Sequence, residues 1–258
     1  MSSLMHKSAA GRILSGGPFQ KIAVKSWSVG LRGGGRDGVV SVDDFLPYVA
    51  GNYDELEADA QSTVSANNDI INGEVAISSS ASGADDGEAY LGASRLSGLK
   101  LRLTAGKVAA FESRFKVNSI TGDNLTIFVG LLESAKPVAA NLITDADDLV
   151  ANDGCGIKLT AGLSSMDIIY GPDLSNPTTH KAAAHVLVAD TYVNFGLFCD
   201  GTNVEFFVDG QKSGDSVALA SVAADGVVLK PVALVKRAAD GTAIATLTVD
   251  SFATACEI

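Results

Sequence analysis

The sequence predicts an all-β fold in which two antiparallel sheets pack as a sandwich, preceded by an extended N-terminal arm that carries a short helix. Short runs rich in Val, Ile and Phe alternate with Gly, Asp, Asn and Ser, which is typical of strands and turns. Gly is frequent, at 27 of 258 residues, and glycine readily adopts the positive φ angles that many tight turns require. Two Asp-Gly dipeptides, at 200–201 and 209–210, favour the left-handed backbone of tight hairpin turns.

The clearest strand covers residues 111–117, where apolar and charged side chains alternate. Phe111, Phe115 and Val117 fall on one face, and the charged residues of the run fall on the other. This period of two predicts a half-buried strand. Residues 125–132 are apolar on one face and partly apolar on the other, which predicts a central strand.

Around the two Asp-Gly turns, residues 195–211 predict a three-stranded meander. Val204, Phe206 and Val208 share one face of its middle strand. About ten strands at this spacing predict a two-sheet sandwich. The remaining strands are expected at 74–78, 88–91, 156–159, 167–170, 185–188, 231–236 and 245–252.

The first 66 residues have a different pattern. Asn52 is a helix N-cap residue with Glu55 three positions on, and apolar residues follow, so a short helix is expected there. Upstream, Gly-rich pieces separate apolar runs too short to build a core. We therefore expect residues 1–66 to be an arm or docking segment and residues 67–258 to be the sandwich domain.

Charge divides the chain in the same way. The net charge is −11, but six basic residues precede the first acidic residue, Asp37. Residues 1–36 therefore carry +6, and residues 37–258, with 13 basic against 30 acidic residues, carry −17. Such a body repels polyphosphate, and no apolar run is long enough to span a bilayer, so neither nucleic acid nor a membrane is an expected partner. The six arm cations are the candidate partner-binding residues: Lys7, Arg12, Lys21, Lys25, Arg32 and Arg36.

Two motifs resemble ligand sites without meeting their requirements. Residues 33–38 match G-x-G-x-x-G, but Val39 and the residues after it do not begin a helix that could hold a pyrophosphate. The loop 145–154 carries four Asp and one Asn that could offer oxygens to calcium. Its spacing is not that of a twelve-residue calcium loop, and such residues also form ordinary turns. We expect a solvated loop, no metal and no cofactor.

Catalytic groups are not evident either. Glu205 and Asp209 lie on the same side of a predicted strand and resemble a glycosidase pair, but no aromatic sugar platform accompanies them. His180 and His185 are separated by an odd number of residues, which predicts opposite faces of a strand and no shared metal. No Gly-x-Ser-x-Gly motif exposes a nucleophile. The sequence therefore predicts no catalytic residue.

The three cysteines are widely separated and form no Cys-x-x-Cys pair. An odd number gives no disulfide framework, so all three are predicted to be free thiols made in a reducing cytosol. Cys199 shares the apolar face of the meander and is expected to be the most buried. The other two are Cys155 and Cys256.

From about residue 69 to the end, the chain resembles the concanavalin A-like, or laminin G-like, jelly-roll domain. It is similar in particular to jelly-roll proteins of tailed bacteriophages. The laminarinase-like enzymes of this fold carry a Glu-x-Asp-x-x-Glu strand that is missing here, and the calcium- and manganese-ligand set of legume-type lectins cannot be placed on this sequence. The pieces that carry the resemblance are residues 85–90, 110–117, 128–133, 152–157, 204–210 and 247–252.

The resemblance implies a non-enzymatic structural protein of the virion, most plausibly a capsid decoration protein. It would be made in the host cytoplasm and stand on the outer capsid surface as a homo-oligomer. Its arm would dock on the major capsid protein or on another virion protein. The alternative is a carbohydrate-binding adsorption module of a head fibre or tail, with a glycan as partner. A glycoside hydrolase ranks below both.

Overall fold

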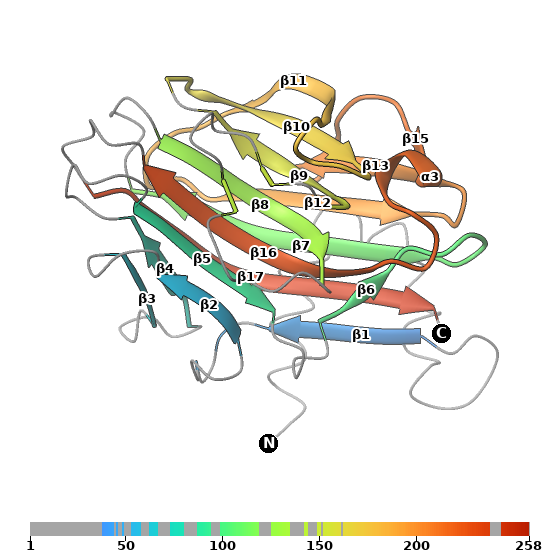
Figure 1. Cartoon of the computed structure of the whole chain (residues 1–258), viewed down its shortest axis with the longest axis horizontal. Helices are drawn as coiled ribbons and strands as arrows, with labels where there is room; N and C mark the ends of the chain where they lie inside the picture. Colours follow the sequence, from blue (N-terminus) through green and yellow to red (C-terminus); the bar gives the residue numbers. More distant parts are fainter. Residues whose placement is uncertain are drawn as a thin grey trace.

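The expected all-β sandwich is confirmed by a computed structural model, in which two antiparallel sheets face one another (Figure 1). Among the described residues the only helix is the four-residue α3 (Leu219–Val222). That part of the chain contains no helix long and apolar enough to cross a membrane. The structure describes residues 38–43, 45, 48, 53–57, 62–66, 73–79, 87–93, 99–118, 125–134, 142–143, 149–150, 152–160, 162–237 and 244–257.

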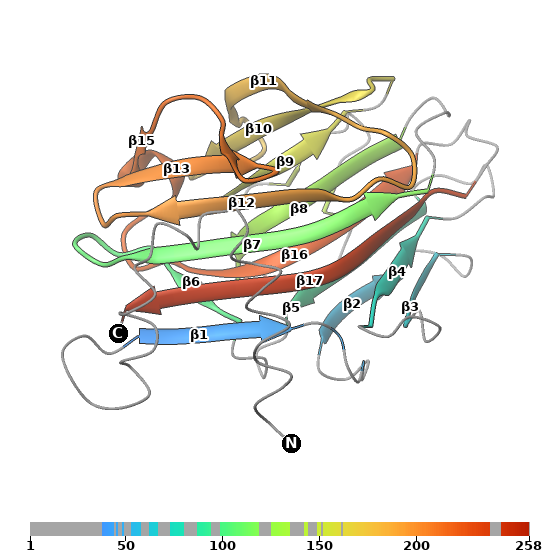
Figure 2. The same ribbon diagram turned by 180° about the vertical axis from the view of Figure 1, so that it is seen from behind.

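Sheet A is the nine-stranded sheet that faces the viewer in Figure 2. Its main path is β14-β13-β12-β7-β17-β4-β3, with β1 paired to β17 and β15 paired to β13. The strands are β1 (Gly38–Asp43), β3 (Thr63–Ala66), β4 (Val75–Ser78), β7 (Ala109–Val117), β12 (Val193–Cys199), β13 (Asn203–Val208), β14 (Gln211–Lys212), β15 (Val217–Ala218) and β17 (Thr246–Glu257).

Sheet B is the eight-stranded sheet in front in Figure 1. Its main path is β11-β10-β9-β8-β16-β5-β2, and β6 pairs with β16. The strands are β2 (Tyr53–Glu57), β5 (Gly87–Ala93), β6 (Leu101–Arg102), β8 (Leu125–Glu133), β9 (Gly154–Leu159), β10 (Ser165–Gly171), β11 (Thr178–Val186) and β16 (Val228–Arg237).

The main core lies between the two sheets. It is built by the alternate residues of each strand that point toward the opposite sheet. Phe111 of β7 lies 6.4 Å, centroid to centroid, from both Phe195 of β12 and Phe252 of β17. The predicted strand at 111–117 and the meander over 195–211 are both confirmed, as β7 and as β12 to β14. The central position predicted for 125–132 is also confirmed, since β8 lies between β9 and β16.

A second apolar cluster covers the outer face of sheet B. Leu142, Ile143 and Leu149, from the connection between β8 and β9, pack there against residues such as Phe128. The buried carboxylate of Glu88 holds this connection, because it accepts the backbone N–H groups of Leu142 at 2.8 Å and Ile143 at 3.1 Å. The connection therefore covers the central strands of this face, whereas the edge strand β11 stays largely exposed.

Two expectations concern residues 38–66: the helix that begins at Asn52 and the domain boundary at residue 66. The helix expected to begin at Asn52 is wrong, because residues 53–57 and 63–66 are the strands β2 and β3. Pairing of β2 with β5 and of β3 with β4 prevails over the local capping signal. β1 likewise pairs with β17. Three strands thus lie on the arm side of the boundary expected at residue 66, and independent folding of residues 67–258 stays a prediction.

Candidate functional site

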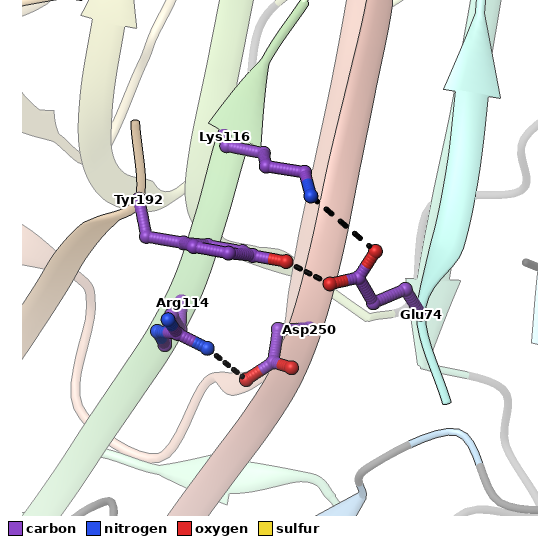
Figure 3. Close-up of polar contacts among 5 residues, drawn as sticks. All are labelled: Glu74, Arg114, Lys116, Tyr192 and Asp250. Carbon is purple, nitrogen blue, oxygen red and sulfur yellow. Dashed lines mark hydrogen bonds and ion pairs between the residues drawn. The ribbon is translucent and has the colours of Figure 1, made fainter. Parts of the chain in front are cut away.

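A cluster of charged and aromatic side chains lies on the outer face of sheet A (Figure 3). Alternation along β7 turns Phe111 and Phe115 into the core, so Arg114 and Lys116 point outward. They meet Tyr192, which lies directly before β12. This pairing joins neighbouring strands on the solvent side of the sheet.

The ring of Tyr192 lies between the two cations, as Figure 3 shows. The Arg114 guanidinium carbon is 3.6 Å from the ring centroid, and the Lys116 Nζ is 4.6 Å from it. The Tyr192 hydroxyl donates a hydrogen bond to the buried carboxylate of Glu74. Because cations occupy the ring, this tyrosine does not offer an open stacking platform to a sugar.

Each cation of the cluster is also paired with a carboxylate. Arg114 donates to Asp250 at 3.0 Å, and the Lys116 Nζ lies 3.6 Å from Glu74 Oε2. A register shift between Val249 and Ser251 in β17 accompanies the outward placement of Asp250. The two carboxylates are almost fully buried and the cations partly exposed, so the cluster is a neutral network that joins β4, β7, β12 and β17.

Glu112, two residues before Arg114 on the same face, has a different environment. It is 7 % exposed, and its Oε2 atom has no hydrogen-bond partner. Burial raises the pKa of this carboxyl from 4.5 to about 8. Such a group keeps its proton near neutral pH and could act as a general acid. Hydrolysis of a glycoside needs a second carboxyl at a defined separation, and Asp250 on this face is already bonded to Arg114.

The two carboxylates considered as a glycosidase pair serve separate structural roles. Glu205 accepts a hydrogen bond from Lys212 at 2.9 Å. Asp209 has a positive φ of 48° at the hairpin turn and accepts the Asn194 N–H at 2.9 Å. The turn that the Asp-Gly dipeptide predicted is therefore present, and it accounts for Asp209.

The histidines were expected on opposite faces of a strand, and this is wrong. Both reach the β13–β14 hairpin: His185 Nδ1 is 3.5 Å from Oδ2 of Asp209 in its turn, and His180 Nε2 is 2.9 Å from the carbonyl of Ser213, which directly follows β14. Two register shifts between β10 and β11 change the face on which residues of β11 lie. The histidines thus link the edge of sheet B to the edge of sheet A.

The acidic loop is described only in part, and residues 144–148 and 151 lie outside the described residues. Asp153 Oδ2 accepts the Ala224 N–H at 2.9 Å, and Asn152 donates to the Val150 carbonyl at 3.2 Å. Within the described ranges, no group of three or more His, Cys, Asp or Glu side chains could hold a metal. The six arm cations predicted to bind a partner, Lys7, Arg12, Lys21, Lys25, Arg32 and Arg36, also lie outside the described residues.

All three cysteines are free thiols in the structure. Cys155 and Cys199 both have no exposed surface, and Cys256 is half-buried. The expectation that Cys199 is the most buried therefore holds only jointly with Cys155. Burial raises the thiol pKa of each of the three.

Comparison with known proteins identifies solved structures that share this fold. No protein-family model and no curated protein matches the sequence. Peanut lectin matches with a TM-score of 0.56 at 11% identity, covering 86% of this chain and 98% of the lectin. A glycoside hydrolase family 16 endo-glucanase from Bacteroides ovatus matches with a TM-score of 0.56 at 13% identity, covering 82% and 98%. The endo-β-1,4-glucuronan lyase of Trichoderma reesei matches with a TM-score of 0.55 at 12% identity, covering 85% and 95%.

The chain therefore has the concanavalin A-like jelly-roll fold that lectins and glycoside hydrolases share. The predicted jelly roll is confirmed at this level. Sequence reasoning missed the cluster around Tyr192, because its members come from four distant segments. The one local signal was the charged outward face of residues 112–116.

Proposed function

We propose that the chain is a non-catalytic structural protein of a virion that decorates the outer capsid surface and docks through its N-terminal cations. The observation that carries the proposal is the separation of charge: +6 in residues 1–36 and −17 in the remainder. A basic segment of this kind suits an acidic protein surface, while the acidic body keeps exposed copies soluble. The resemblance to phage jelly-roll proteins supports the same function.

The described site supports a structural role over a catalytic one. Arg114 is paired with Asp250 and Lys116 with Glu74. The charges of the cluster therefore form ion pairs between neighbouring strands. Glu112 is buried, and the two described carboxylates of the neighbouring cluster, Asp250 and Glu74, are paired with Arg114 and Lys116 rather than arranged for glycoside chemistry. The central part of the outer face of sheet B is covered by the chain's own apolar residues.

Binding to capsids tests this proposal. Capsids assembled from the major capsid protein encoded with this chain are sedimented with the full-length protein. Replacing the six arm cations by Gln should strongly weaken co-sedimentation, and wild-type binding should fall as salt rises. Lys107→Gln with Lys181→Gln, two exposed lysines of the body, is the matched control and should bind normally. Equal binding of the arm variant and wild type would refute arm docking.

A carbohydrate-binding adsorption module is the second candidate. The observation that favours it is the fold shared with peanut lectin and with the carbohydrate recognition domain of Emp47p. Glycan-array binding by the full chain, unchanged in the six-cation variant, would support this candidate. Capsid association lost in that variant, without glycan binding, would support the decoration protein.

A further inference from the structure

Arg237, the last residue of β16, is a buried cation without a partner. It is 6 % exposed, and its Nε atom is buried and has no hydrogen-bond partner. No hydrogen bond or ion pair joins its guanidinium to any residue that the structure describes. Two other buried cations of β16 differ in this respect. The Lys230 Nζ lies 2.7 Å from Asp54 Oδ2, and the Lys236 Nζ donates to the Ile143 carbonyl at 3.1 Å.

Alternation along β16 turns Arg237 toward the opposite sheet. Ala233 and Val235 belong to the main core, and Arg237 is the next residue on the same face of the strand. Its two neighbours in the printed register are Leu125 of β8, which is also a core residue, and Gly87 of β5. Neither neighbour has a polar side chain, so no carboxylate lies beside the guanidinium along sheet B.

The end of β16 faces sheet A at one end of the sandwich. β16 contacts β17 and β4 across the core, and both views show that β16 ends where β17 begins (Figures 1 and 2). Ser79 directly follows β4 and is fully buried, but its hydroxyl already interacts with the backbone of Ala245. The Ser79 Oγ lies 3.4 Å from the Ala245 carbonyl oxygen and 3.3 Å from the Ala245 nitrogen.

A buried charge is costly unless it is paired and hydrogen-bonded. A carboxylate partner would be easy for this chain to supply, because residues 37–258 contain 30 acidic residues against 13 basic ones. Arg237 nevertheless has none in the described part of the chain. A guanidinium also presents a rigid fork of N–H donors that matches the two oxygens of a carboxylate or phosphate group.

We infer that Arg237 anchors a binding site for a small oxyanion, with a carboxylate or phosphate group, at this end of the sandwich. The oxyanion supplies the negative charge and the acceptors that the surrounding residues lack. The ligand group is small because only 6 % of Arg237 is exposed. The site is separate from the six arm cations, so this inference does not depend on the proposed function.

Urea unfolding of the full chain at neutral pH tests the inference, with sodium phosphate and sodium acetate each compared with sodium chloride at equal ionic strength. An oxyanion that binds only the folded protein raises the urea midpoint. Phosphate also stabilises proteins in general, so the decisive quantity is the difference between wild type and Arg237→Met, which removes the charge and keeps a long side chain. Arg102→Met is the matched control, because Arg102 is exposed and lies in β6 beside β16.

Wild type and Arg102→Met should be stabilised by at least one of the two oxyanions, and the response identifies the group that binds. Arg237→Met should lose this response, and in chloride its midpoint should be no lower than that of wild type, because an unpaired buried charge has been removed. The variant with all six arm cations replaced by Gln should respond as wild type does. Calorimetric titration of wild type with the same oxyanion should show one saturable site.

An equal response of Arg237→Met and wild type would overturn the inference, since the oxyanion would then bind elsewhere. A midpoint of Arg237→Met below that of wild type in chloride would also overturn it, because Arg237 would then have a partner within the protein. If Arg237→Met does not fold, Arg237→Lys, which keeps the charge and loses the fork, takes its place and should bind the oxyanion more weakly. Absence of calorimetric binding of both oxyanions to wild type would refute the site without any variant.

Discussion

The buried carboxyl of Glu112 should make the free energy of unfolding depend on pH, and one substitution can isolate this contribution. In the folded protein this carboxyl has a pKa of about 8, raised from 4.5 by burial. The unfolded chain loses the proton near the ordinary value. Between these two pH values the folded state binds more protons than the unfolded state, so stability falls as pH rises. Glu112→Gln removes the ionisable group and keeps the shape.

The size of the effect follows from the two pKa values. Each pH unit between them corresponds to about 1.36 kcal/mol, so the raised pKa of Glu112 costs roughly 5 kcal/mol of stability at and above pH 8. Below pH 4.5 the carboxyl is protonated in both states and the cost vanishes. The free energy of unfolding of Glu112→Gln should therefore exceed that of wild type increasingly as pH rises from about 4.5 to 8.

Urea unfolding followed by circular dichroism, at several pH values, measures this difference. Glu205→Gln is the control, because Glu205 belongs to the same sheet but is paired with Lys212. Its difference from wild type should stay small across the range. Parallel pH profiles for wild type and Glu112→Gln would refute the reasoning, since they would mean that water or a cation solvates the carboxyl.

Three further predictions concern the rest of the fold. Tyr192→Phe removes the donor to the buried Glu74 carboxylate and should lower the free energy of unfolding by about 1–3 kcal/mol, measured with urea. Cys256 should react with a thiol reagent before Cys155 and Cys199, which should react only on unfolding; equal rates in the native protein would contradict their burial. The fragment 38–258 should unfold cooperatively, while 67–258, which lacks β1, β2 and β3, should still fold but with a lower urea midpoint; equal urea midpoints would show that the three strands are dispensable.

The strands that the sequence predicted well are those whose own residues contain the pattern. Residues 111–117 alternate strictly, and the Asp-Gly dipeptides mark both turns of the meander. β2 was missed because Tyr53–Glu57 is mostly acidic and follows a capping residue, so its local preference is helical. Only its partner β5, some thirty residues on, makes it a strand. Long-range pairing of this kind leaves no local mark.

The candidate site was harder to predict than the fold for a related reason. Irregularities of one residue decide which face a side chain occupies. The register shift at Asp250 accompanies its contact with Arg114, and the shifts in β11 direct both histidines to the β13–β14 hairpin. Strict alternation, the rule that predicted β7, gave the wrong faces for His180 and His185. Bulges are not visible in a single sequence.

The sign of the salt dependence separates docking through the arm from binding through the body in one titration. Docking through the arm cations is attraction between unlike charges, so added salt weakens it. Apolar contact through the acidic body is opposed by charge repulsion from an acidic capsid surface, and added salt screens that repulsion. At high salt, the full chain should therefore release from capsids if the arm holds it, whereas a chain held by apolar contacts of its body would remain bound.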